Sequence, residues 1–114
     1  RECSNLEDAI LFSTMPQVGS RSETELFNKV AEKCKLTRFG LDCYAYALLA
    51  MGQIDLVIEA DLNIYDIQGP LAVVEAAGGV VTNWHGGPVD GGGQVIAAGD
   101  PKIHSAAIKL LNNL

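Results

Sequence analysis

The 114-residue sequence has few basic residues and no long apolar run. Lys and Arg number 8 against 14 Asp and Glu, the formal net charge is −6, and the basic residues form no cluster. This balance argues against nucleic acid or an anionic membrane as the main partner, and it would repel a phosphate monoester unless a cation supplied positive charge. No apolar run approaches the ~18 residues of a membrane-spanning helix, so we expect no membrane partner.

Cysteine is also scarce, and Cys3, Cys34 and Cys43 lack the short spacings of a disulfide framework. We therefore expect a reducing, cytoplasmic compartment. The cysteines and the two histidines also lack the spacing of zinc ligands, which argues against a zinc site. The glycine run at residues 91–93 is not closed by Gly-Lys-Ser/Thr, so we interpret it as a turn and not as a phosphate-binding loop.

Short apolar runs alternate with amphipathic stretches along the chain. They predict strands at residues 9–14, 36–39, 56–59, 80–82 and 94–98, and helices after Ser22, over Leu41–Met51, from Asp66 and from Pro101. The order β α β α β α β β α is typical of an α/β domain that has a mixed sheet with flanking helices. We therefore predict a single α/β domain over residues 1–114.

Two helix starts carry capping signals. Ser22 and Glu25 fit a capping box, in which the serine is the N-cap and the glutamate reaches back to it. Asp100 followed by Pro101 predicts an N-cap and the first helical residue of the last helix.

The stretch Leu41–Met51 has a single charged residue, Asp42, so we expect this helix to be buried on most of its sides. Tyr44, Leu48 and Met51 recur at i, i+4 and i+7 with Ala45 and Leu49 beside them, which predicts that this set faces the core. From the sequence alone, Asp42 is interpreted as a cap of this helix.

Two acids flank the connection between the strand at residues 56–59 and the next helix. Glu59 ends the strand and Asp66 begins the helix, and this edge of an α/β sheet is where ligands collect. Asp66 can be a simple N-cap or a ligand of a hard cation, and Glu59 can be a solvated strand-end residue or a substrate contact. Pro70 has no N–H for the first helical bond, so we expect the helix to begin later than Asp66 or to have a tight first turn.

The pair Tyr65-Asp66, followed by Glu-Ala-Ala-Gly-Gly at residues 75–79, resembles the C-terminal signature of the inositol monophosphatase family of metal-dependent phosphatases. The segment 36–50, which includes Arg-x-x-x-Asp-Cys-Tyr-x-Tyr, is similar to the branch of that family that includes histidinol-phosphatases. The resemblance covers nearly all of this chain but only about the C-terminal half of a family member. We therefore expect the chain to be the C-terminal domain of a larger phosphatase.

The resemblance implies a Mg²⁺-dependent phosphomonoesterase whose favoured substrate is histidinol phosphate. It implies that Asp66 is a metal ligand and that Glu59 and Asp42 contact the organic part of the substrate. Two carboxylates would favour the amine and imidazole of histidinol phosphate over a polyol. Arg38 is a further substrate-binding candidate because it could reach the phosphate, although it could equally pair with Asp42 or lie on the surface.

The family's other metal ligands belong to an N-terminal half, in a Glu-Glu pair and an Asp-Pro-x-Asp-Gly-Thr motif that do not occur in this sequence. We therefore assign no catalytic residue within these residues and expect the chain alone to be inactive.

Two alternatives stay open. One is a phosphatase for inositol 1-phosphate or another small sugar phosphate, and the other is a non-catalytic small-molecule-binding domain on the same scaffold. Family members are commonly homodimers, which implies a homodimer for the intact protein.

Overall fold

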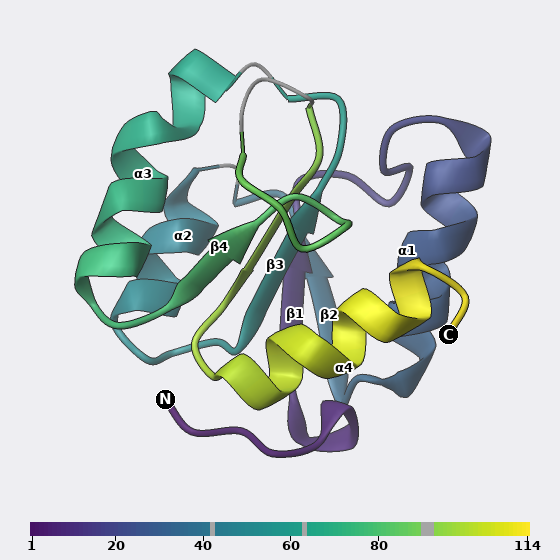
Figure 1. Ribbon diagram of the computed structural model, residues 1–114, viewed down its shortest axis with the longest axis horizontal. Coiled ribbons are helices and arrows are strands. Elements are labelled where there is room, and N and C mark those ends of the chain that lie inside the picture. The colour runs from purple at the N-terminus through teal and green to yellow at the C-terminus, as the bar shows by residue number, and fades with distance from the viewer. Residues whose placement is uncertain (42, 63, 90–92) are drawn as a thin grey trace.

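The computed structural model describes residues 1–41, 43–62, 64–89 and 93–114, and for residues 64–66 the backbone alone. A five-stranded sheet carries helices on both of its faces (Figure 1). The elements in chain order are η1 (Leu6–Asp8), β1 (Ile10–Ser13), α1 (Arg21–Lys33), β2 (Leu36–Phe39), α2 (Tyr44–Ala50), β3 (Leu56–Glu59), α3 (Ile64–Ala76), β4 (Val80–Thr82), β5 (Val95–Ala98) and α4 (Pro101–Leu111). This order confirms the predicted α/β class, with the short 3₁₀ helix η1 as an addition.

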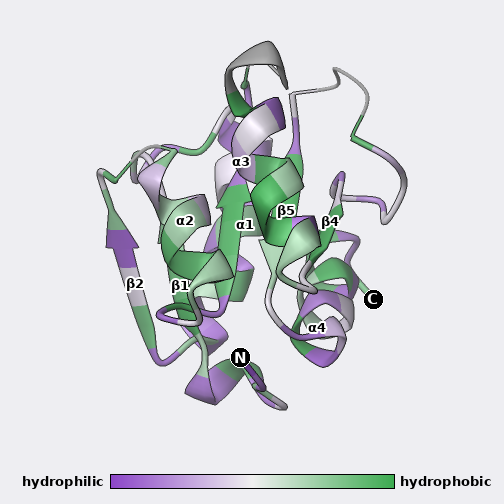
Figure 2. Cartoon of the chain, turned by 90° about the vertical axis from the view of Figure 1, so that its left-hand side faces the viewer, coloured by the Kyte–Doolittle hydropathy of each residue, from purple (hydrophilic) through white to green (hydrophobic). Residues whose placement is uncertain are grey.

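The sheet has the strand order β2-β1-β3-β5-β4. The strands β2, β1 and β3 are parallel, and β5 runs antiparallel to both β3 and β4, so the sheet is mixed as predicted. All four residues of β3 are buried, because the strand is central and helices cover both of its faces. Figure 2 shows mostly apolar colouring on β1 and β5, whereas the outer strand β2 is partly hydrophilic.

The sheet separates two apolar cores. The helices α1 and α4 cover one face, where Leu11 and Ile58 pack with Phe27 from α1 and Ile103 from α4. The helices α2 and α3 lie side by side over the other face (Figures 1 and 2). There the core joins strand residues to α2 and α3 and consists of Phe12, Ala45, Tyr46, Leu49, Ile54, Val57, Ile67, Leu71, Val74, Val95 and Ala97.

The capping box of α1 lies two residues before the predicted one. Ser20 is the N-cap, and its side chain accepts a hydrogen bond from the Glu23 N–H while the Glu23 carboxylate accepts one from the Ser20 N–H. Ser22 is inside the helix, so the predicted N-cap was wrong. Ser-x-x-Glu occurs twice in overlapping positions, and the turn that decides between them is made at Gly19, whose φ is +65°.

The helix α2 is shorter than predicted, and the predicted inward set is right for Ala45 and Leu49. It starts at Tyr44, and its buried residues are Ala45, Tyr46 and Leu49. Tyr44 is 58% exposed and Met51 is 66% exposed, so the predicted inward set was wrong for these two residues. An almost uncharged helix has little contrast between its faces, and its periodicity therefore does not identify the buried side.

Among the described residues, no helix is both long and apolar enough to cross a bilayer.

The helix α3 begins at Ile64, which is earlier than predicted, and keeps Pro70 in its interior. Asp66 is therefore the third residue of the helix, and the interpretation of Asp66 as the N-cap was wrong. Pro70 has no N–H, so it leaves the carbonyl of residue 66 without its helical donor. The buried side chains of Ile67, Leu71 and Val74 belong to the core beneath this part of the helix, and such packing rather than propensity stabilises the helix.

The start of α4 is as predicted. Asp100 is the N-cap and Pro101 occupies the first turn. One carboxylate oxygen of Asp100 accepts from the Lys102 N–H at 2.9 Å, and the other accepts from the Cys3 N–H at 2.9 Å. The cap therefore also fixes the N-terminal segment of the chain to the sheet.

Candidate active-site edge

The parallel strands β1, β2 and β3 have their C-terminal ends at the same end of the sheet, and we call this end the Glu59 edge. Glu59 is the last residue of β3, and Thr14 follows the last residue of β1. The first turn of α3 starts five residues after Glu59 at the same edge. Glu59 is 3% exposed, so the interpretation of this residue as a solvated strand-end acid was wrong.

Two hydroxyl groups hold the Glu59 carboxylate. The Thr14 hydroxyl donates to Oε1, and the Tyr46 hydroxyl donates to Oε2 at 2.5 Å. A buried carboxylate is costly unless hydrogen bonds replace its hydration, and bonds to a charged acceptor are the strong ones. Glu59 is therefore fixed in the fold by groups from two other segments, the end of β1 and the helix α2.

The backbone of Glu59 is also held. The indole N–H of Trp84 is shared between the carbonyl oxygen of Glu59 at 3.1 Å and that of Val95 at 3.2 Å. Trp84 is buried and follows β4, so its side chain joins the end of β3 to the beginning of β5. Sequence reasoning missed both Tyr46 and Trp84. The only signal for Trp84 was that a single tryptophan follows the predicted strand at residues 80–82.

The start of α1 lies at the same edge. The Gln94 side-chain amide, just before β5, donates to the Glu23 carboxylate at 2.6 Å. Burial alone would raise the pKa of Glu23, but the hydrogen bonds from Ser20 and Gln94 outweigh it and hold that pKa below its usual value. Glu23 is therefore a structural acid that closes the capping box and contacts the β5 segment.

The remaining predicted residues are placed as follows. Arg38 is exposed on the outermost strand, β2. It pairs with Phe12 of β1, and Phe12 in turn pairs with Val57 of β3. Aligned neighbours share a face of the sheet and side chains alternate along a strand, so Arg38 and Glu59 are on the same face. The strand β1 lies between them. Asp42 is outside the described residues.

For Asp66, the structure gives the backbone position in the first turn of α3. A helix start favours an anionic side chain, because its first N–H groups have no helical acceptor. In the part of the chain that the structure describes, no three His, Cys, Asp or Glu side chains gather into a group that could hold a metal ion.

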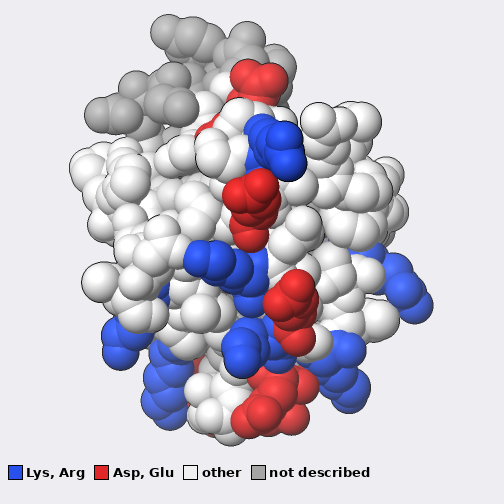
Figure 3. Space-filling view, turned by 90° about the vertical axis from the view of Figure 1, so that its right-hand side faces the viewer, with Lys and Arg blue, Asp and Glu red and all other residues white. Residues whose placement is uncertain are grey.

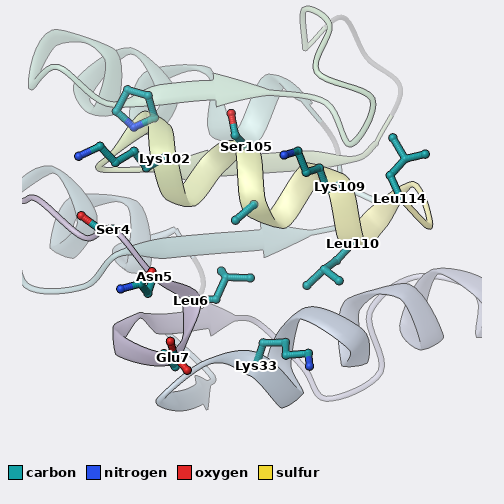
Figure 4. A pocket seen from close by; sticks show the side chains of 12 residues that line it. Ser4, Asn5, Leu6, Glu7, Lys33, Lys102, Ser105, Lys109, Leu110 and Leu114 are labelled. Carbon is teal, nitrogen blue, oxygen red and sulfur yellow. The ribbon is translucent and has the colours of Figure 1, made fainter.

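A large hollow of the described surface lies elsewhere. It has a volume of about 760 Å³ and runs between the segment around η1 and the helix α4, where Leu6 and Leu110 meet Lys33, Lys102 and Lys109 (Figure 4). On the face that Figure 3 shows, acidic and basic side chains are interspersed and do not form a patch of one sign. The hollow shares no residue with the Glu59 edge.

Comparison with known proteins identifies the fold and the family. The model of the inositol monophosphatase family matches residues 1–114. The chain belongs to the inositol monophosphatase family. The resemblance seen in the sequence is thereby confirmed at the level of the family. As a member of the inositol monophosphatase family, the chain is related to phosphatases, and the Glu59 edge is its candidate active-site edge.

Three curated relatives illustrate the range of the family. The chain is 40% identical over 120 residues to the bifunctional phosphatase IMPL2, chloroplastic, of Arabidopsis thaliana, a match that covers 97% of this chain and 35% of the relative. It is 31% identical to an inositol-1-monophosphatase of Mesorhizobium japonicum, over 91% of this chain and 41% of the relative. It is 27% identical to a histidinol-phosphatase of Streptomyces coelicolor, over 97% of this chain and 42% of the relative.

A solved structure supports the same assignment. An inositol monophosphatase from Zymomonas mobilis superposes with a TM-score of 0.94 at 37% identity, over 98% of this chain and 45% of that chain. The chain thus spans less than half the length of this structure and of the three curated relatives.

Proposed function

We propose that this domain belongs to a Mg²⁺-dependent phosphomonoesterase and that it supplies one metal ligand and the contacts to the leaving group. The observation that carries the proposal is the buried carboxylate of Glu59, which accepts hydrogen bonds from Thr14 and Tyr46 at the edge of the sheet where α3 begins. Membership of a family of phosphatases supports the reaction class.

Asp66 is the proposed ligand of Mg²⁺, together with carboxylates from a part of the intact protein outside these residues. The chemistry of the donor fits, because Mg²⁺ prefers carboxylate oxygens and is bound by one or two of them along with water and phosphate. When bound, the ion neutralises charge on the phosphate and lowers the pKa of a coordinated water molecule. No covalent intermediate with the chain is proposed.

The residues of this chain act on the organic part of the substrate. Glu59 accepts a hydrogen bond from a hydroxyl or ammonium group of the leaving group, and Asp42 adds a second negative charge at the start of the α2 segment. Arg38 is on the Glu59 side of the sheet and is proposed to contact the phosphate. Two acidic residues are proposed for this edge, and Arg38 is the one basic residue proposed beside them. This balance favours a cationic leaving group.

Histidinol phosphate is therefore the proposed substrate, with inositol 1-phosphate or another small sugar phosphate as the alternative. The related proteins include a histidinol-phosphatase and an inositol-1-monophosphatase, so both candidates have a precedent in the family. A cytoplasmic homodimer is proposed for the intact protein.

Asp42→Ala in the intact protein is expected to remove the preference for histidinol phosphate. The substitution deletes one of two negative charges beside the ammonium group, so kcat/KM for histidinol phosphate should fall roughly tenfold, as for the loss of one charged hydrogen bond. The value for inositol 1-phosphate should change little. Glu75→Gln, on the exposed last turn of α3, is the matched control. A wild-type enzyme that prefers inositol 1-phosphate would refute the substrate assignment.

The isolated 114 residues are expected to release no phosphate from any phosphomonoester in Mg²⁺. The described residues contain no group of three metal-binding side chains, and one carboxylate alone does not retain Mg²⁺. Phosphate release by the isolated chain, measured beside the intact protein at equal concentration, would contradict this. An intact protein that is inactive with Mg²⁺ on every phosphomonoester would instead support the non-catalytic alternative.

A further inference from the structure

We propose that Tyr46 is a positioning residue that aims the Glu59 carboxylate at the leaving group and so contributes to substrate choice. This inference rests on the proposed function, because it assigns to Tyr46 a role in the contact that Glu59 makes with substrate. Tyr46 is fully buried, and its hydroxyl lies 2.5 Å from Oε2 of Glu59.

The geometry fixes the rotation of the carboxylate. A glutamate side chain has three rotatable bonds, and its terminal carboxylate torsion has only a broad preference. Here Thr14 donates to Oε1 and Tyr46 donates to Oε2, so each oxygen has its own donor from a different segment. With both oxygens held, the carboxylate plane has one orientation relative to the sheet edge. Without the Tyr46 hydroxyl, Oε2 loses this hydrogen bond in a site nearly closed to water.

Tyr46 differs from the other groups that hold Glu59. Thr14 is only partly buried, and Trp84 binds the backbone of Glu59 and not its side chain. Tyr46 is the third residue of α2, and the segment that enters α2 carries Asp42. Its hydrogen bond therefore links the start of α2 to the end of β3, where the proposed contact of Glu59 with the leaving group arises.

The test compares two substrates on the intact protein with Tyr46→Phe. Histidinol phosphate offers an ammonium group to Glu59, whereas phenyl phosphate has no hydrogen-bonding group on its leaving group. We expect Tyr46→Phe to lower kcat/KM for histidinol phosphate by roughly tenfold to a hundredfold, because hydrogen bonds to charged groups have effects of this size. The value for phenyl phosphate should stay within about threefold, since positioning of the phosphate and the metal is untouched.

Two further comparisons separate positioning from simple support of the fold. Tyr44→Phe removes a hydroxyl from an exposed tyrosine of the same helix and should leave both substrates unaffected. In a Glu59→Gln background, Tyr46→Phe should have no additional effect of more than about twofold, because residues that act as a unit are non-additive. Thr14→Val, which removes the donor to Oε1, should reproduce the substrate-selective loss, and it serves as the second test if Tyr46→Phe folds poorly.

Equal losses for both substrates would overturn the inference and leave Tyr46 with a structural role only. Full additivity with Glu59→Gln would overturn it as well. If the wild-type protein hydrolyses neither phenyl phosphate nor histidinol phosphate, the proposed function itself fails, and this outcome is seen before any variant is measured.

Discussion

Asp66→Asn in the intact protein is expected to lower Mg²⁺-dependent phosphate release by more than about a hundredfold. Loss of a residue that merely orients a metal ligand costs about 10–100-fold in metal affinity or activity, so loss of a direct ligand should exceed that range. Asparagine keeps the size of the side chain but removes the negative charge that a hard cation requires. The substitution is nearly isosteric and leaves the buried residues of α3, Ile67, Leu71 and Val74, unchanged, so the fold should be retained.

Two measurements decide the prediction for Asp66. Titration calorimetry with Mg²⁺ should show weaker binding to Asp66→Asn than to the wild type, and raising the Mg²⁺ concentration should recover part of the activity. Glu75→Gln, an exposed acid near the other end of the same helix, should leave both quantities unchanged. Wild-type Mg²⁺ affinity in Asp66→Asn would show that this acid is not a ligand.

The largest expected effect on stability comes from Asp55→Ala. Asp55 is 2% exposed and accepts hydrogen bonds from Arg1 Nε at 2.7 Å, from Arg1 Nη2 at 2.8 Å and from the Ile10 N–H at 2.8 Å. We expect unfolding free energy to fall by about 3 kcal/mol, at the low end of the range for breaking a buried ion pair. The low end applies because the Arg1 side chain is 41% exposed and can regain water when its partner is lost.

The same residue predicts how stability depends on pH. Burial would raise the pKa of Asp55, but the hydrogen bonds from Arg1 and Ile10 outweigh it and hold that pKa below its usual value. A lowered folded-state pKa means that the contribution of Asp55 is complete above the unfolded-state value of about 3.9 and is lost as the pH falls further. Asp55→Ala should therefore lower the free energy of unfolding most at pH 7, and by progressively less below about pH 4.

Urea unfolding at several pH values measures this difference. Asp8→Ala replaces a nearby acid that is exposed, and it should change the unfolding free energy by no more than about 0.5 kcal/mol at any of these pH values. A loss in Asp55→Ala that is the same at pH 7 and at pH 3 would contradict the role of the charged carboxylate.

The sequence was sufficient to predict the architecture because local patterns encode it. Leu36–Phe39 and Leu56–Glu59 were predicted to the residue, since a short apolar run between polar segments has few other solutions. Local patterns were insufficient where two local structures fitted the same sequence pattern equally well. The two overlapping Ser-x-x-Glu segments differ only in the turn before them, and the apolar α2 offered no polar face to set its rotation.

The candidate site was only partly predictable for a different reason. The position of Glu59 at a strand end follows from local pattern, but its burial depends on donors that are 45 and 13 residues away in the chain. A hydroxyl at such a distance leaves no periodic signal. Tyr46 was therefore overlooked in favour of Tyr44, whose spacing matched a helical repeat but whose side chain is exposed.

The shared hydrogen bond of Trp84 has a practical consequence. The chain has one tryptophan, and its indole N–H is bonded to the last residue of β3 and the first residue of β5. Its fluorescence in the 114-residue domain thus comes from a single, known place next to Glu59. Ligand binding or local opening at that place would alter the emission, so intrinsic tryptophan fluorescence can report on this site without an added dye.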